Sequence, residues 1–209
     1  MKHLLLLPFI LGLALSSSCN PPETADAHAA HHSPEQAAQI MPAAELSDMS
    51  LYQLDSEWQT EQGHTIKLAD LQGKVQLVAM MYTNCTYTCP RIVADLKRIE
   101  AGIDKYKEVG IVLVTMDPAN DTPEKLKEFA GENKLDPSRW QLLTSNDASI
   151  QELAVLLNMK YKKAPNGDIA HSNIISVLNV QGEIIYQQEG LGKDPDETVK
   201  SIEGLLQRM

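Results

Sequence analysis

The chain has 209 residues, of which 43% are hydrophobic and 22% are charged, and it contains 11 glycines and 11 prolines. This length suits one domain with extensions, and the composition excludes collagen-like and fully disordered chains. The formal net charge of −10 gives a surface that repels phosphate backbones, so we expect no nucleic-acid partner.

The N-terminus carries an export signal. Lys2 precedes an apolar run from Leu4 to Leu15, which is too short to span a bilayer. Three serines and then Cys19 follow, and this pattern resembles a bacterial lipoprotein signal. The resemblance implies that residues 1–18 are removed and that Cys19 is lipidated, which anchors the chain on a membrane, facing the periplasm or the cell exterior. The alternative is an ordinary secretory signal; both export the protein to a compartment where disulfides can form.

Residues 19–49 are predicted to be the lipidated cysteine and a flexible tether. The segment is rich in proline, alanine and acidic residues, and it cannot bury much apolar surface. It carries side chains of metal-ligand type at His28, His31, His32, Met41 and Met49. Loose metal capture by this cluster and a polar spacer with incidental histidines remain equal alternatives.

A single α/β domain is predicted over residues 50–209. Short strands at 51–54 and 65–68 flank a turn near Gln62-Gly63 and form an N-terminal β-hairpin. Buried strands are then predicted at 75–83, 111–116 and 140–144, each followed by a helix, at 90–106, 123–130 and 147–157. Thr122 is the expected N-cap of the second of these helices, with Pro123 at its first position.

The last part of the chain predicts a hairpin and a closing helix. Strands at 174–180 and 183–188 are joined by Gln181-Gly182, and the helix spans 195–209. Alternating strands and helices followed by a hairpin imply a central mixed sheet with helices on both faces.

Two cysteines mark the candidate site. Cys85 and Cys89 lie between the first buried strand and its helix, where α/β sheets usually place their sites, and Pro90 follows directly. Such spacing lets two sulfurs form a disulfide or chelate one ion, and a helix N-terminus favours thiolate over thiol. The alternative, two cysteines packed as small apolar residues, does not account for this placement.

The Cys85-x-x-x-Cys89-Pro90 motif resembles that of the SCO/SenC family of thioredoxin-like copper proteins. A second matching motif is the strand running into Asp117-Pro118, with Asp121-Thr122-Pro123 after it. A third is His171, shortly before the late hairpin. The resemblance covers residues 50–209 and implies a thioredoxin-like fold, with copper held by Cys85, Cys89 and His171. The chain departs from many members in having Thr86-Tyr87-Thr88 between the cysteines.

The chemistry of this ligand set agrees with copper. Two thiolates and one imidazole suit Cu(I), and a fourth ligand or water allows Cu(II). Zinc competes for the same atoms, but structural zinc sites usually take four protein ligands. The predicted domain has one other histidine, His64, which lies in the early hairpin turn and is not expected near the site.

Asp117 and Asp121 have two interpretations. The structural one is that they start turns and help to begin the helix at Pro123. The functional one is that Asp117 adds negative potential beside the metal without binding it. The sequence favours the structural role.

Two functions fit these residues. The favoured one is a copper carrier rather than an enzyme, and the resemblance implies that it delivers copper to the copper centre of cytochrome c oxidase, with an oxidase subunit or its assembly factors as partners. The alternative is a membrane-anchored thiol-disulfide oxidoreductase that uses Cys85 and Cys89 as its redox pair. The favoured function rests on His171 and on the cysteine spacing, because dedicated thiol exchangers usually carry Cys-x-x-Cys.

Overall fold

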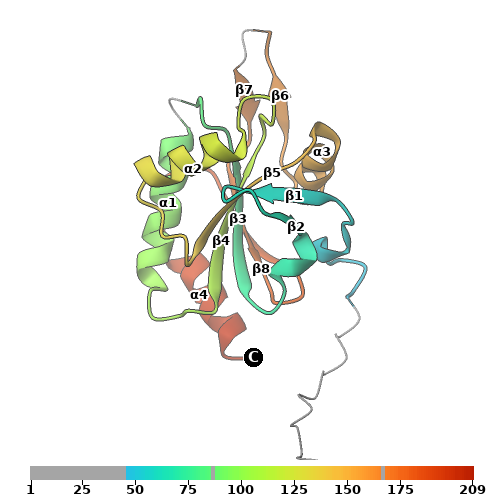
Figure 1. Ribbon diagram of the computed structural model, residues 1–209. Coiled ribbons are helices and arrows are strands. Elements are labelled where there is room, and N and C mark those ends of the chain that lie inside the picture. Colours follow the sequence, from blue (N-terminus) through green and yellow to red (C-terminus); the bar gives the residue numbers. More distant parts are fainter. Residues whose placement is uncertain (1–45, 86–87, 166–167) are drawn as a thin grey trace, which may run out of the picture. The chain divides into compact units, whose positions relative to one another are not determined.

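The computed structural model describes residues 46–85, 88–165 and 168–209 (Figure 1). The predicted signal, Cys19 and the tether as far as residue 45 lie outside these ranges. Within the described ranges, none of the helices combines the length and the apolar character needed to cross a membrane.

A seven-stranded mixed sheet forms the centre of the domain, in the order β2-β1-β5-β4-β3-β8-β9. The three central strands β3, β4 and β5 run parallel, whereas β8 is antiparallel to β3 and β1 is antiparallel to β5. The strands are β1 Glu57–Thr60, β2 Thr65–Lys67, β3 Val75–Met81, β4 Val109–Thr115, β5 Trp140–Thr144, β8 Ile174–Leu178 and β9 Ile184–Glu189.

Helices cover both faces of this sheet. All seven residues of β3 are buried, which requires cover on each side. Right-handed crossovers from β3 to β4 and from β4 to β5 place α1 and α2 on one face, α4 packs beside α1, and α3 lies on the other face (Figure 1). The helices are α1 Cys89–Gly102, α2 Pro123–Glu132, α3 Asp147–Leu156 and α4 Asp196–Leu206.

The helix that follows the cysteines is held by an apolar stripe. Ile92, Leu96 and Ile99 recur at helical spacing and are buried against the sheet. The helix ends at Gly102 and not at residue 106 as predicted, because Ile103 leaves the helical conformation with φ −116° and its N–H bonds to the Glu100 carbonyl.

The prediction of a strand at 51–54 is wrong. Residues Leu51–Gln53 form a 3-10 helix, η1, which begins where the Ser50 hydroxyl accepts a hydrogen bond from the Tyr52 N–H at 3.1 Å. The N-terminal hairpin itself is present, but its first strand is β1, and Gly63 in its turn has φ +80°. A local side-chain cap therefore overrode the apolar pattern of residues 51–54.

The late hairpin and the predicted N-cap of α2 are confirmed. Strands β8 and β9 pair antiparallel around Gly182, which has φ +82°, and the side chains of Thr122 and Asn146 cap α2 and α3. The sequence did not predict a separate two-stranded ribbon, in which β6 (Tyr161–Lys163) pairs antiparallel with β7 (Ile169–His171). This ribbon matters because its second strand ends at a candidate ligand.

Candidate metal centre

The first candidate ligand lies in the turn that leaves the central strand. Cys85 follows β3, and its N–H donates to the Tyr82 carbonyl at 3.2 Å. Cys89 is the first residue of α1, with Thr88 at the N-cap and Pro90 directly after it. The strand-to-helix turn predicted from the sequence is therefore the element that brings the two sulfurs together.

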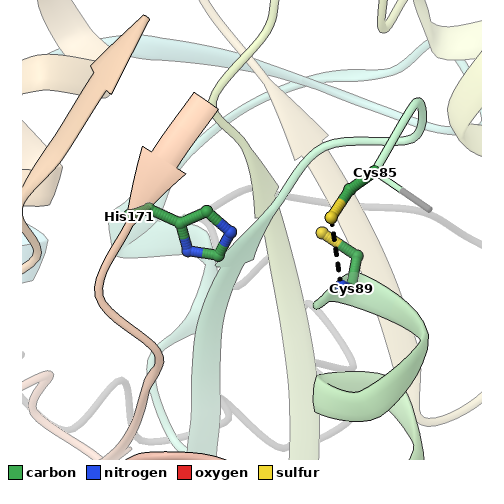
Figure 2. Close-up of side chains that lie close together, drawn as sticks. All are labelled: Cys85, Cys89 and His171. Atoms are coloured by element: carbon green, nitrogen blue, oxygen red, sulfur yellow. Dashed lines mark hydrogen bonds between the residues drawn. The ribbon is translucent and has the colours of Figure 1, made fainter. Parts of the chain in front are cut away.

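The two sulfurs also accept hydrogen bonds from the backbone. The Cys89 N–H donates to Cys85 Sγ at 3.3 Å (Figure 2), and the Tyr82 N–H donates to Cys89 Sγ at 3.4 Å. No disulfide joins these two cysteines in the structure. Cys89 is fully buried, and Cys85 exposes only 8% of its surface, so Cys85 is the sulfur nearer to solvent.

His171 reaches the cysteines from the opposite side of the site. It ends β7, where it pairs with Tyr161, and Figure 2 shows its imidazole directed toward the two sulfurs. Its Nδ1 lies 2.8 Å from the Ser172 carbonyl oxygen, and its ring packs edge-on against Tyr82, with ring centroids 6.2 Å apart. One hydrogen bond and one aromatic contact thus fix the orientation of the ring.

The three donor atoms have the spacing that a metal site needs. Cys85 Sγ, Cys89 Sγ and a ring nitrogen of His171 all lie within 4.8 Å of one another. Donors bound to one ion at about 2.0–2.3 Å lie roughly 4 Å apart, so only a small contraction would complete the site. The set predicted from the sequence is therefore brought together, and its two thiols and one imidazole are soft enough for a copper ion.

Burial, not the helix N-terminus, dominates the ionisation of Cys89. Its removal from water raises the pKa of the thiol well above the ordinary value, and the hydrogen bond from Tyr82 N–H opposes this only in part. Burial therefore outweighs the favourable effect on the thiolate that was expected from the start of α1. A metal ion that binds here must displace the thiol proton.

Asp121 stabilises the start of the turn that carries Cys85. It is fully buried, and its carboxylate accepts hydrogen bonds from the N–H of Thr83 at 3.0 Å, from the Thr83 hydroxyl and from the Thr115 hydroxyl. Thr83 follows β3 and Thr115 ends β4, so one carboxylate ties two strand ends together. The N-cap of α2 is Thr122, which leaves the Asp121 side chain for this bracing role.

The other two predicted residues lie apart from the donor set. Asp117 is nearly buried and accepts a hydrogen bond from the Asn120 side chain at 2.7 Å, and it is not a member of the Cys-Cys-His group. Its electrostatic influence on a metal stays a prediction. His64 is exposed in the β1–β2 turn, away from the group, as expected.

The sequence pattern missed two side chains at this site. The Thr88 hydroxyl lies 2.9 Å from Cys85 Sγ and 3.3 Å from His171 Nε2, and Tyr82 packs against the His171 ring. No local signal pairs residues that are more than eighty positions apart in the chain. The ribbon that carries His171 did have a signal, because an Asn-Gly dipeptide stands at 166–167 in the sequence, between its two strands.

A thioredoxin-like fold with a Cys-Cys-His group at the carboxyl end of its central strand defines the class of this protein. The sequence model of the SCO1/SenC family matches residues 48–207. The chain belongs to this family, as its three motifs indicated.

Known members resemble the chain over most of the domain. The SCO1 protein homolog of Bacillus subtilis is 26% identical over 148 residues, which are 69% of this chain and 77% of the relative. The crystal structure of a SCO1/SenC family lipoprotein from Bacillus anthracis matches with a TM-score of 0.69 at 23% identity, over 78% of this chain and 98% of that one. The structure of Arabidopsis thaliana ScoI with copper bound matches with a TM-score of 0.65 at 18% identity, over 74% and 97%. These two structures confirm the fold.

Cys89 should react as a buried thiol with a raised pKa. In a Cys19→Ala, Cys85→Ser variant it is the remaining cysteine of the three. Because the thiolate fraction is one half at the pKa and levels off only about one to two pH units above it, its alkylation by iodoacetamide should be slow at pH 8 and should still be rising steeply above pH 10. The same variant unfolded in urea should reach half of its maximal rate near the ordinary pKa of about 8.5. A native rate that reaches its half-maximum at that pH would contradict the dominance of burial.

Proposed function

We propose that this protein is a copper carrier, which holds the ion with Cys85, Cys89 and His171. The observation that supports this most is the convergence of two sulfurs and one imidazole nitrogen within 4.8 Å. A soft set of three donors suits Cu(I), and one further ligand or a water would accommodate Cu(II).

Family and fold support copper over zinc. The chain belongs to the SCO1/SenC family, and the matching Arabidopsis protein binds copper. A structural zinc site usually takes four protein ligands, whereas the group in the described part of the chain offers three. The copper is cargo, so a site with three protein ligands and an open fourth position serves release better than a closed site would.

Replacing His171 should weaken copper binding without disabling the cysteines. Loss of a residue that only hydrogen-bonds a metal ligand already costs about 10–100-fold in metal affinity. His171 is itself a proposed ligand, so His171→Ala should weaken Cu(II) binding by on the order of 100-fold or more. Cu(I) should weaken less, because two thiolates can hold it alone. Exchange with a small disulfide needs only the thiols and should be largely retained. Titration of both copper states and an exchange assay on the same variant measure these effects.

His64→Ala provides the matched control, since His64 is exposed on the β1–β2 turn. It should bind both copper states like the unmodified protein. The carrier proposal fails if His171→Ala binds copper normally while its disulfide exchange collapses.

Thiol-disulfide exchange is the second candidate function. It is favoured by two cysteine sulfurs that lie within 4.8 Å of each other on a thioredoxin-like fold. Cys85 is the more exposed sulfur and Cys89 is fully buried, so Cys85 would attack a substrate disulfide and Cys89 would resolve the mixed disulfide. The His171→Ala experiment separates the two functions, because it removes a copper ligand and leaves both thiols.

We further propose that the recipient of the copper is the copper centre of cytochrome c oxidase. BsSco, whose structure matches the chain with a TM-score of 0.65 at 25% identity, is a member of the Sco family of cytochrome c oxidase assembly proteins. The recipient is an oxidase subunit or an assembly factor that passes the ion on. Transfer would proceed by exchange of one ligand at a time.

A bacterium that lacks this protein should therefore assemble oxidase with too little copper. Its oxidase activity and the copper content of the purified enzyme should fall, and both should return with the unmodified gene or with His64→Ala. His171→Ala should restore neither. Full oxidase activity in the deletion strain under copper limitation would exclude this recipient.

The proposed carrier is held on a membrane by lipid at Cys19. The support is the sequence pattern of a short apolar run, three serines and a cysteine. In a bacterial host, the unmodified protein should incorporate labelled fatty acid, and Cys19→Ala should not. Cys85→Ala is the control, since it also removes one cysteine but should keep the label. Equal labelling of Cys19→Ala would disprove the anchor.

A further inference from the structure

The Thr88 hydroxyl occupies a special place in the site, between two of the three proposed ligands. Its Oγ1 lies 2.9 Å from Cys85 Sγ and 3.3 Å from His171 Nε2. Thr88 is half-buried, so its contacts are partly shielded from water. The chain therefore places a hydroxyl where it touches both ligands at once.

This hydroxyl does not serve the helix that it precedes. Thr88 is the N-cap of α1, and threonine at this position usually accepts a hydrogen bond from the first turn. Its side chain makes no such bond. Thr122, the N-cap of α2, does make it, with Lys125 N–H as the donor. Two threonines in equivalent positions are thus used differently, and Thr88 is directed into the site.

The partners of His171 fix the direction of these hydrogen bonds. Nδ1 lies 2.8 Å from the Ser172 carbonyl oxygen, which can only accept, so Nδ1 carries the proton. In the neutral ring Nε2 is then an acceptor, and the Thr88 hydroxyl donates to it. The oxygen of Thr88 keeps its lone pairs for the Cys85 S–H. With a neutral imidazole and a protonated Cys85, the Cys85 S–H donates to the Thr88 oxygen, and the Thr88 hydroxyl donates to His171 Nε2.

We propose that Thr88 is a positioning residue that presents Cys85 and His171 to the metal and then stabilises the bound state. This inference rests on the proposed copper site. In the metal-free protein, the hydroxyl holds Sγ and Nε2 on either side of itself. On binding, Nε2 and Sγ form bonds to the ion and the Cys85 proton leaves to solvent. The hydroxyl keeps its own proton, turns away from Nε2 and donates to the Cys85 thiolate.

The hydrogen bonds of the Thr88 hydroxyl differ in strength between the free and the bound state, and this difference predicts the sign of the change in copper affinity. In the free state the bond to neutral Nε2 is an ordinary one, and the bond from the Cys85 S–H is weak because a thiol is a poor donor. In the bound state the bond to the thiolate is charge-assisted and about twice as strong as an ordinary one. Removing the hydroxyl therefore costs the bound state more than the free state. Copper affinity should fall by about fivefold, because a net difference of about one hydrogen bond is lost.

The experiment compares two threonines in the Cys19→Ala full chain. Thr88→Val keeps the shape and removes the hydroxyl, and it should weaken Cu(I) about fivefold in competition with a chelator, with little change in melting temperature. Thr88→Ser should bind within twofold of the unmodified protein. Thr122→Val is the matched control, and it should lower the melting temperature through loss of its cap while copper affinity is unchanged.

A second measurement needs no copper. In the metal-free protein, the ¹⁵N resonance of His171 Nε2 should move toward the position of a nitrogen without a hydrogen-bond donor in Thr88→Val and stay in place in Thr88→Ser. If Thr88→Val does not fold, Thr88→Ala provides the same comparison with a smaller side chain.

The outcomes separate this inference from the function on which it rests. If the unmodified protein binds no copper, the proposed function fails. If it binds copper, and Thr88→Val binds as tightly or more tightly, Thr88 is not a positioning residue and the copper site stands. An unchanged His171 resonance in Thr88→Val would overturn the inference in the same way.

Discussion

The pairing of β3 with a parallel strand on one side and an antiparallel strand on the other determines where the site forms. Because β4 runs parallel to β3, the ends of both strands meet at one edge, and Asp121 ties Thr83 to Thr115 there. Because β8 runs antiparallel, its start lies at the same edge, with Ile175 opposite Ala79. His171 lies just before β8, so the register that buries the core also brings this histidine to the cysteines.

Two opposing effects act on the thiol at the start of α1. The helix N-terminus favours the charged form, and full burial beneath the cysteine turn disfavours it. Burial prevails at Cys89, as its raised pKa shows. Such a thiol is inert until a metal or a partner displaces its proton, which protects Cys89 from oxidation. Reactivity is thereby concentrated on Cys85, the sulfur nearer to solvent.

Most of the fold was readable from the sequence because its strongest signals are local. The apolar run from Val75 predicted the central strand, and the spacing of Ile92, Leu96 and Ile99 predicted α1. Thr122 predicted the N-cap of α2. The three proposed ligands were predicted from the resemblance of three motifs, in their order along the chain, to those of the SCO/SenC family. The failures were of two kinds: at Ser50 a side chain capped a 3-10 turn against the apolar pattern, and at Thr88 the partner is a distant residue. Neither contact produces a repeating apolar pattern in the sequence, so neither could be predicted from it.

The graded burial of the three proposed ligands suggests an order of exchange for a carrier. Cys89 is fully buried, Cys85 is nearly so, and His171 is half-buried on the β6–β7 ribbon. An incoming ligand from a recipient would reach the ion beside His171 first, and an imidazole is a weaker ligand for Cu(I) than a thiolate. His171 would therefore leave first and Cys89 last. On its release, Nε2 would again accept a hydrogen bond from the Thr88 hydroxyl, so the empty site would return to its ordered arrangement.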